Sequence, residues 1–183
     1  MNNLSAPAIK VCDNKSVGVF VFGVEDLRYQ RGARLLLIER ATFPWGWAVP
    51  SGHLDGEVCW PEQAHQELLE EVGLDIPREQ ISLGLILRAK KSNQCRRFGG
   101  DWHEWRLYAT YSNKLDEIVV NPREVKNFCW ASCNRLEFLA ERARQWLEGE
   151  ISDEEWKESP GLEPLTLDWL SLKGLEPFLQ SLR

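Results

Sequence analysis

The stretch "HQELLEEVGL", residues 65–74, constrains the fold of this chain more than any other segment. Pro61 suits the first turn of a helix, where its missing N–H is not needed. Gly73 suits a C-terminal cap in the left-handed conformation. At 100° per residue, the helix predicted over 61–72 has one apolar stripe. The members of that stripe are Ala64, His65, Leu68, Leu69 and Val72.

Three glutamates, Glu67, Glu70 and Glu71, are predicted to adjoin this stripe, within about 100° of one another. Like charges at helical spacing repel by roughly 0.2–0.5 kcal/mol per pair. Acidic residues near a helix C-terminus also oppose the helix dipole. A hard divalent cation such as Mg²⁺ or Mn²⁺, bound by carboxylate oxygens, would reverse this balance. A solvated acidic face is the alternative, and the residues upstream favour the metal.

The segment "GHLDGEVCWPEQAHQELLEEVGL", residues 52–74, resembles the signature of the Nudix family. That signature is a glycine, five residues, Glu, seven residues, then Arg-Glu-aliphatic-x-Glu-Glu-x-Gly-aliphatic. The preceding "LLLIER" and "WAVPSGH" are similar to the family's lead-in of a strand, an arginine and Trp-x-x-Pro-Gly-Gly. The direct matches are Gly52, Glu67, Leu68, Glu70, Glu71, Gly73 and Leu74. The resemblance implies an α/β (α+β) fold, the Nudix-type α/β/α sandwich with a mixed β-sheet.

The segment departs from the family pattern at three places. The family's first glutamate falls on Val58, although Glu57 is adjacent, and Ser51 replaces the first glycine of the usual pair. The family's arginine, which pairs with a carboxylate, is Gln66 here. Glutamine can form hydrogen bonds but cannot supply the charge. This departure leaves open a non-catalytic Nudix module that binds a nucleotide or a protein partner.

The resemblance implies a pyrophosphohydrolase that depends on Mg²⁺ or Mn²⁺. Such enzymes cleave the diphosphate bond of a nucleoside diphosphate linked to another group. Metal ions bridge the phosphates, and a carboxylate takes a proton from the attacking water. By resemblance, Glu67 and Glu71 are the best metal ligands, and Glu70 is a ligand or the general base. The carbonyl of Gly52 and the side chain of Glu57 are the further candidates for the metal site.

Glu104 is a further candidate for the metal site or for the general base. It lies in the middle of the predicted strand 101–111, where alternation puts it on one face with Trp102 and Arg106. In Nudix folds a carboxylate downstream of the signature can complete the metal site or act as base. A salt bridge with Arg106 is the alternative.

Four residues are candidates for substrate contacts. Arg40 follows the second predicted strand, where the family often has an arginine that contacts phosphate; an ion pair with Glu39 is the alternative. Trp45 could stack on a nucleobase. Lys91 and Arg97 flank a basic loop that could steer an anionic substrate, and a solvated loop is equally compatible with the sequence.

Length and composition predict a single domain over 1–183, with a flexible N-terminus over 1–15. No apolar run reaches the ~18–20 residues that span a bilayer, and no signal peptide is discernible, so we expect a cytoplasmic protein. A net charge of −6 argues against general nucleic-acid binding. The expected partner is a small-molecule nucleotide, and the family also implies a possible homodimer.

Outside the signature, β-rich runs predict strands and two segments predict helices. The helices are expected over 134–150 and within 164–182, and the polar stretch 150–164 is expected to be a flexible loop. Substrate specificity is expected to reside around Trp45 and in 90–100 and 151–164. The predicted strands cover 16–23, 34–40, 47–53, 81–91, 101–111 and 127–132.

The cysteines and histidines carry no recognisable motif. The five cysteines are odd in number and irregularly spaced, so free thiols are expected, and His53 and His65 are expected to be structural. An isopentenyl-diphosphate isomerase-like enzyme shares the fold but needs an active-site cysteine and histidine ligands upstream of the signature. Only Cys12 lies well upstream, and no histidine precedes His53. The isomerase is therefore disfavoured.

Overall fold

A computed structural model describes residues 10–183 of the chain except 57, 94 and 96. Within this part, seven strands form one mixed sheet in the order β3-β2-β1-β6-β5, with β4 paired to β1 and β7 paired to β2. The strands are β1 Lys15–Gly23, β2 Arg34–Arg40, β3 Trp47–Ala48, β4 Ser51–His53, β5 Leu85–Ser92, β6 Trp102–Ser112 and β7 Val125–Ala131. The helices are α1 Trp60–Val72, α2 Arg78–Leu83, α3 Cys133–Leu147, α4 Asp153–Glu158, α5 Pro164–Trp169, the 3₁₀ turn η1 Lys173–Leu175 and α6 Glu176–Gln180.

Strand β1 lies at the centre of the sheet because nearly all of its residues are apolar and buried. It runs parallel to β6 and antiparallel to β2 and β4, which makes the sheet mixed. Parallel neighbours need a long crossover connection, and here that connection contains β2–β4, α1, α2 and β5. The crossover brings the signature segment 52–74 against the sheet.

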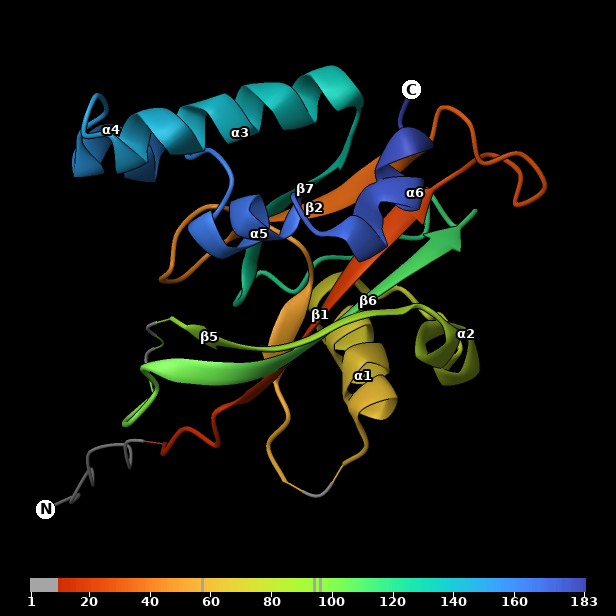
Figure 1. The fold of residues 1–183 in the computed structure, drawn as a ribbon, viewed down its shortest axis with the longest axis horizontal. Coiled ribbons are helices and arrows are strands. Elements are labelled where there is room, and N and C mark those ends of the chain that lie inside the picture. Colours follow the sequence, from red (N-terminus) through yellow and green to blue (C-terminus); the bar gives the residue numbers. More distant parts are fainter. Residues whose placement is uncertain (1–9, 57, 94, 96) are drawn as a thin grey trace, which may run out of the picture.

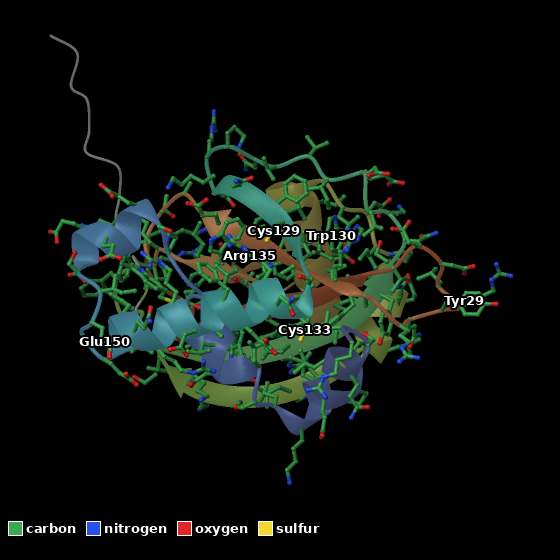
Figure 2. The ribbon with its side chains drawn as sticks, turned by 90° about the horizontal axis from the view of Figure 1, so that it is seen from above. Tyr29, Cys129, Trp130, Cys133, Arg135 and Glu150 are labelled. Atoms are coloured by element: carbon green, nitrogen blue, oxygen red, sulfur yellow. The ribbon has the colours of Figure 1, made fainter. Side chains whose placement is uncertain are left out.

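The two faces of β1 belong to different cores, because side chains alternate along a strand. Val17, Val19 and Val21 pack against α1 through Ala64, Leu68 and Val72. Phe20 and Phe22 face the opposite core, which includes Leu139 of α3 and Trp169 of α5. Figure 1 shows α1 and α2 on one side of the sheet and α3 to α6 on the other, and Figure 2 shows α3 lying across the sheet. The expected α/β/α sandwich is confirmed.

Helix α1 confirms the predicted segment and its cap, since Gly73 adopts φ 67° and closes the last turn. The predicted stripe is wrong at Leu69, which is 41% exposed. Glu67 and Glu71 lie instead on the buried face, beside Ala64, Leu68 and Val72. The helix is therefore rotated so that two of the three clustered carboxylates, those of Glu67 and Glu71, face the protein.

Three predictions of local structure are wrong. The segment 78–83 is helix α2, bounded by Pro77 and Gly84, so the strand predicted from residue 81 begins only at Leu85. The tail 164–182 holds three short helical pieces: residues 170–172 separate α5 from η1, and Pro177 lies in the first turn of α6, where proline is tolerated. The expected loop 150–164 contains α4, whose Trp156 is buried and stacks on Trp146 at 4.5 Å between ring centroids.

The expected flexible N-terminus, 1–15, lies only partly within the described residues. Residues 1–9 lie outside the described part, whereas Cys12 is buried and Val11 forms a bridge with Phe98. None of the described helices combines the length and the apolar character needed to cross a membrane.

Candidate functional site

A cleft of about 940 Å³ brings most of the predicted site residues together. Its walls come from β4, α1, the end of β2, the β5–β6 connection and the residues just before β7. The predicted residues that line it are Gly52, Glu67, Glu70, Glu71, Arg40 and Arg97. Glu57 lies outside the described residues.

Glu67 and Glu71 are buried carboxylates with few partners. Glu67 accepts a hydrogen bond of 2.8 Å from Nε2 of Gln63, and Glu71 accepts one of 2.9 Å from the backbone N–H of Ser51. Burial, together with the nearby charge of Glu70, raises the pKa of Glu67 to about 7. Burial, together with the charge of Glu67, raises the pKa of Glu71 to about 8. Each carboxyl group is therefore costly to ionise without a compensating positive charge.

Gly52 allows this arrangement because it has no side chain. A Cβ built on Gly52 would overlap the carboxyl group of Glu67. Gly52 lies in β4, where it pairs with Val17 of the central strand. The Glu67 carboxyl group is thus held against a backbone segment that the sheet fixes in place.

These residues fit a divalent cation of the Mg²⁺ or Mn²⁺ type. Both ions prefer hard oxygen ligands and are commonly bound through one or two carboxylates. Glu67 and Glu71 supply buried carboxylate oxygens, and the exposed Glu70 lines the same cleft. A bound cation would offset both the burial and the mutual repulsion that raise the two pKa values.

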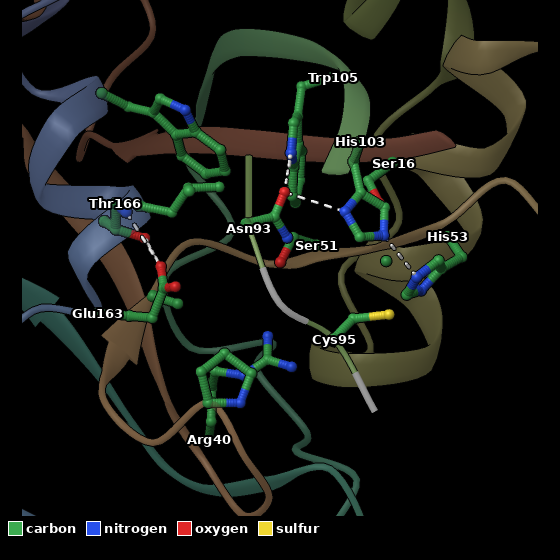
Figure 3. Close-up of a pocket in the computed structure, with 15 residues that line it drawn as sticks. Ser16, Arg40, Ser51, His53, Asn93, Cys95, His103, Trp105, Glu163 and Thr166 are labelled. Carbon is green, nitrogen blue, oxygen red and sulfur yellow. Dashed lines mark hydrogen bonds between the residues drawn. The ribbon is translucent and has the colours of Figure 1, made fainter. Parts of the chain in front are cut away.

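Arg40 supplies a positive group whose hydrogen-bonding capacity is not fully used. Its Nε is buried and finds no acceptor among the described residues, although its charge lowers the pKa of Glu71. The alternative partner, Glu39, pairs with Lys126 at 2.9 Å instead. Figure 3 shows the Arg40 side chain at the pocket that adjoins the cleft. An anion in the cleft could accept a hydrogen bond from the Nε–H group of Arg40.

Arg97 also lines the cleft, but it is already paired. Both of its terminal nitrogens donate to the carboxylate of Asp55, and this fork holds the pKa of Asp55 at about 2. A bidentate pair of this kind is geometrically specific. Arg97 therefore adds less uncompensated charge to the cleft than Arg40 does.

Trp45 lies in a second pocket of about 400 Å³ that adjoins the cleft. The two cavities share Phe43 and Pro44. Lys157 lies over the Trp45 ring with its Nζ 4.7 Å from the ring centroid, and the Phe43 ring meets it edge-on. Trp146 and Trp156 complete an aromatic lining, which suits a flat ligand.

Two predicted residues line neither the cleft nor the adjoining aromatic pocket. Lys91 forms a 3.0 Å ion pair with Asp168 of α5. Glu104 lies in β6 opposite Lys15 and Lys90, and it does not line the described cleft. The alternative, a salt bridge between Glu104 and Arg106, is not formed. The Arg106 guanidinium instead stacks on Trp60, 4.2 Å from its ring centroid. The functional roles of Lys91 and Glu104 stay predictions.

Several lining residues had no sequence-based expectation, among them Gln63, Arg123 and Glu124. Gln63 donates to Glu67, and Glu124 lies close enough to raise the pKa of both Glu67 and Glu71. Arg123 lines the cleft beside Glu124. The helical spacing of Gln63 and Glu67, four residues apart, was a usable signal. The irregular segment before β7 offered none.

Comparisons with known proteins identify the family. The NUDIX domain model matches residues 14–152. The fold is similar to that of dihydroneopterin triphosphate pyrophosphohydrolase from E. coli, with 18% identity, a TM-score of 0.55, and coverage of 77% of this chain and 93% of that one. A MutT protein from Methanosarcina mazei Go1 has 14% identity, a TM-score of 0.54, and coverage of 95% and 96%. The Ap4A hydrolase of C. elegans, solved as a binary complex, has 19% identity, a TM-score of 0.50, and coverage of 74% and 90%.

No curated protein matches the chain. The match of the domain model to most of the sequence, together with the sandwich fold, is sufficient to assign it. The chain belongs to the Nudix hydrolase family.

Proposed function

We propose that this chain, as a single Nudix domain, hydrolyses the diphosphate bond of a nucleoside diphosphate linked to another group, with Mg²⁺ or Mn²⁺ as cofactor. One observation carries the proposal: Glu67 and Glu71 are buried in the same cleft as Arg40, whose buried Nε has no acceptor in the part of the chain that the structure describes. Negative groups that need a cation and a positive group that needs an anion thus meet in one place.

The carboxylates of Glu67 and Glu71, with the carbonyl of Gly52, are the groups that would hold the metal. A divalent cation bound there supplies positive charge for the phosphate oxygens and for the leaving oxygen. The guanidinium of Arg40 donates a charge-assisted hydrogen bond to a phosphate oxygen. Arg40 also provides positive charge near Glu71, the function that Gln66 cannot perform.

Glu70 is the proposed general base. Its exposed carboxylate lines the cleft and can accept the proton of the attacking water. The water oxygen forms the new bond to phosphorus as the bridging P–O bond breaks, and the bridging oxygen leaves with the second phosphate. Glu104 is the second candidate for the base, although it does not line the described cleft.

The aromatic pocket is the proposed site for the nucleobase or for another flat part of the substrate. Its volume of about 400 Å³ lies within the range of small-molecule sites. Because it shares Phe43 and Pro44 with the cleft, one ligand could occupy both. Trp45 would provide a stacking surface, at present shared with Lys157.

A nucleotide panel incubated with Mg²⁺ or Mn²⁺ tests the proposal by release of phosphate, pyrophosphate or nucleoside monophosphate. Wild type should turn over at least one member, and Glu67→Gln should lose nearly all activity while staying folded. Glu62→Gln is the matched control, because Glu62 lies on the same helix but pairs with Arg78. Equal rates in wild type and Glu67→Gln would refute the catalytic role of the cluster.

The same panel tests the alternative, a nucleotide-binding module without catalysis. The presence of Gln66 in the cleft, where the family pattern has arginine, favours this alternative. Tight binding of a nucleotide with no turnover, measured by calorimetry and product analysis, would support it over hydrolysis.

A further inference from the structure

Four potential metal ligands from separate parts of the chain converge beside the cleft. They are Cys12 before β1, His53 at the end of β4, Cys95 between β5 and β6, and His103 in β6. Their ligand atoms all lie within 4.8 Å of one another. Figure 3 shows His53, Cys95 and His103 pointing toward a common centre.

The sulfur–sulfur and nitrogen–nitrogen spacings of these atoms are close to those of a tetrahedral zinc site. Usual Zn–S and Zn–N bond lengths place two sulfurs about 3.8 Å apart, two nitrogens about 3.3 Å apart, and sulfur and nitrogen about 3.6 Å apart. The Cys12 and Cys95 sulfurs are 3.7 Å apart, and the Nε2 atoms of His53 and His103 are 3.2 Å apart. The distance from Cys12 Sγ to His103 Nε2 is 3.1 Å, about 0.5 Å shorter than the sulfur–nitrogen separation in such a site.

Hydrogen bonding alone does not satisfy this arrangement. Asn93 Oδ1 accepts from Trp105 Nε1 at 3.2 Å and faces His103 Nδ1 at 2.9 Å, so Nδ1 carries the proton and Nε2 keeps a lone pair. Both Cys12 Sγ and His53 Nε2 approach that one lone pair. A single lone pair cannot serve two donors well, whereas a cation at the centre engages all three atoms.

The surroundings have the features of a supported metal site. The bond from His103 Nδ1 to Asn93 fixes the ring and its tautomer, as outer partners of histidine ligands usually do. The backbone N–H of Asn14 donates to Cys12 Sγ at 3.4 Å, and that of Arg97 donates to Cys95 Sγ at 3.4 Å. Such bonds stabilise thiolates. Both Cys12 and His103 are buried.

We propose that Cys12, His53, Cys95 and His103 bind one Zn²⁺ ion in a closed tetrahedral site. Two thiolates and two imidazoles in this geometry select zinc over hard cations. Four protein ligands leave no open position, so the ion is structural. It connects the N-terminal segment, β4 and the β5–β6 connection, and thereby fixes His53 next to Gly52 and Cys95 near Arg97. The site shares no ligand with the carboxylate cluster, although His53 and Cys95 also line the cleft, and it does not depend on the proposed hydrolysis.

The metal content of the full-length chain tests this site. Elemental analysis and native mass spectrometry of protein purified without a metal-affinity tag should find one zinc ion per chain. Cys95→Ser should lose the zinc. Cys133→Ser, at the start of α3 (Figure 2), and Glu67→Gln should keep it. Wild type that binds no zinc even after incubation with the ion, or Cys95→Ser with full zinc, would overturn the proposal.

Cobalt substitution supplies a readout on the wild-type chain, in case a variant fails to fold. Removing the zinc with a chelator and adding Co²⁺ should give the visible bands of a tetrahedral ion and a near-ultraviolet band from thiolate. An excess of Mg²⁺ should not displace the Co²⁺ ion, so the absorption bands should remain. A weak octahedral spectrum would contradict the site. So would a disulfide between Cys12 and Cys95 in freshly purified, metal-free protein.

Discussion

The carboxyl group of Glu67 occupies the space that any side chain at position 52 would need, so Gly52 and Glu67 are sterically complementary. We expect Gly52→Ala to displace the carboxyl group and to weaken both Mn²⁺ binding and turnover. A displacement of about 1 Å at a catalytic group can cost about 10²-fold in rate. Calorimetric Mn²⁺ titration and steady-state kinetics measure the two effects.

Gly149→Ala is the control for loss of a glycine. Gly149 follows α3 with φ 78°, and no described residue lies within 4 Å of a Cβ built there. This substitution strains the backbone by about 1–2 kcal/mol but leaves the cleft untouched. If Gly52→Ala bound Mn²⁺ as tightly as Gly149→Ala does, the steric relationship would have no functional meaning.

The buried carboxyls predict how the stability of the chain depends on pH when no Mg²⁺ or Mn²⁺ is present. The pKa values of Glu67 and Glu71 are raised from 4.5 to about 7 and about 8. From pH 4.5 up to these raised values, the folded state therefore binds more protons than the unfolded state. The free energy of unfolding therefore falls as pH rises through this window. Below about pH 4.5 the two groups are protonated in both states and contribute no pH dependence.

Urea unfolding from about pH 6 to about pH 9 measures this slope. Glu71→Gln removes one titrating group, so its stability should fall less steeply with pH than that of wild type. The difference between the two proteins reports Glu71 together with its interaction with Glu67. Added Mn²⁺ should stabilise wild type more at high pH than at low pH, because the ligands must be deprotonated. Parallel slopes for the two proteins would contradict the buried state of Glu71.

How much of the site could be predicted from sequence depends on whether its parts are local. Glu67, Glu70, Glu71 and Gly52 lie within one turn-helix segment, so a spacing pattern could predict their convergence. The rotation of α1 was not predictable from apolarity, because Glu67 and Glu71 take buried positions and Leu69 is exposed. In a helix that carries a metal site, some buried positions hold carboxylates instead of apolar side chains, so apolarity alone does not identify the buried face.

Contacts between distant segments escaped prediction. Lys91 pairs with Asp168, which lies in the poorly patterned tail. The Cys12, His53, Cys95 and His103 group spans four segments with no repeated spacing, so motif rules for zinc could not detect it. Strand β6, which carries His103, was predicted, but its parallel pairing with β1 near Cys12 is a property of the fold.

Arg40 and Lys91 should differ sharply on substitution. Arg40→Ala removes a guanidinium whose Nε has no acceptor among the described residues, and a charged hydrogen bond contributes about 1.5–3 kcal/mol. We expect kcat/KM to fall about 10–100-fold. Lys91→Ala breaks only a partly exposed pair with Asp168 and should change kcat/KM by less than about twofold. A larger decrease in kcat/KM for Lys91→Ala would indicate that Lys91 contacts the substrate.

Glu70 and Glu104 compete for the role of general base, and matched substitutions separate them. Glu70 lines the cleft and Glu104 does not, so Glu70→Gln should lower kcat by about 10²–10⁴-fold. Glu104→Gln should alter kcat far less. The pH–rate profile provides the second measurement, because loss of the base removes the acidic limb. If Glu104→Gln removed that limb and Glu70→Gln retained it, the assignment would be reversed.

Trp45 should determine substrate affinity through stacking. Its ring lines the aromatic pocket, and base–aromatic stacking is worth about 1–3 kcal/mol, so Trp45→Ala should raise KM about 10–100-fold with little change in kcat. Trp102→Ala is the matched control, because Trp102 is similarly exposed, 39% against 37%, and also carries a lysine over its ring. Equal KM values for the two variants would place the flat part of the substrate elsewhere. Kinetics with inorganic pyrophosphate as substrate complete the test, since a ligand without a base should not distinguish Trp45→Ala from wild type.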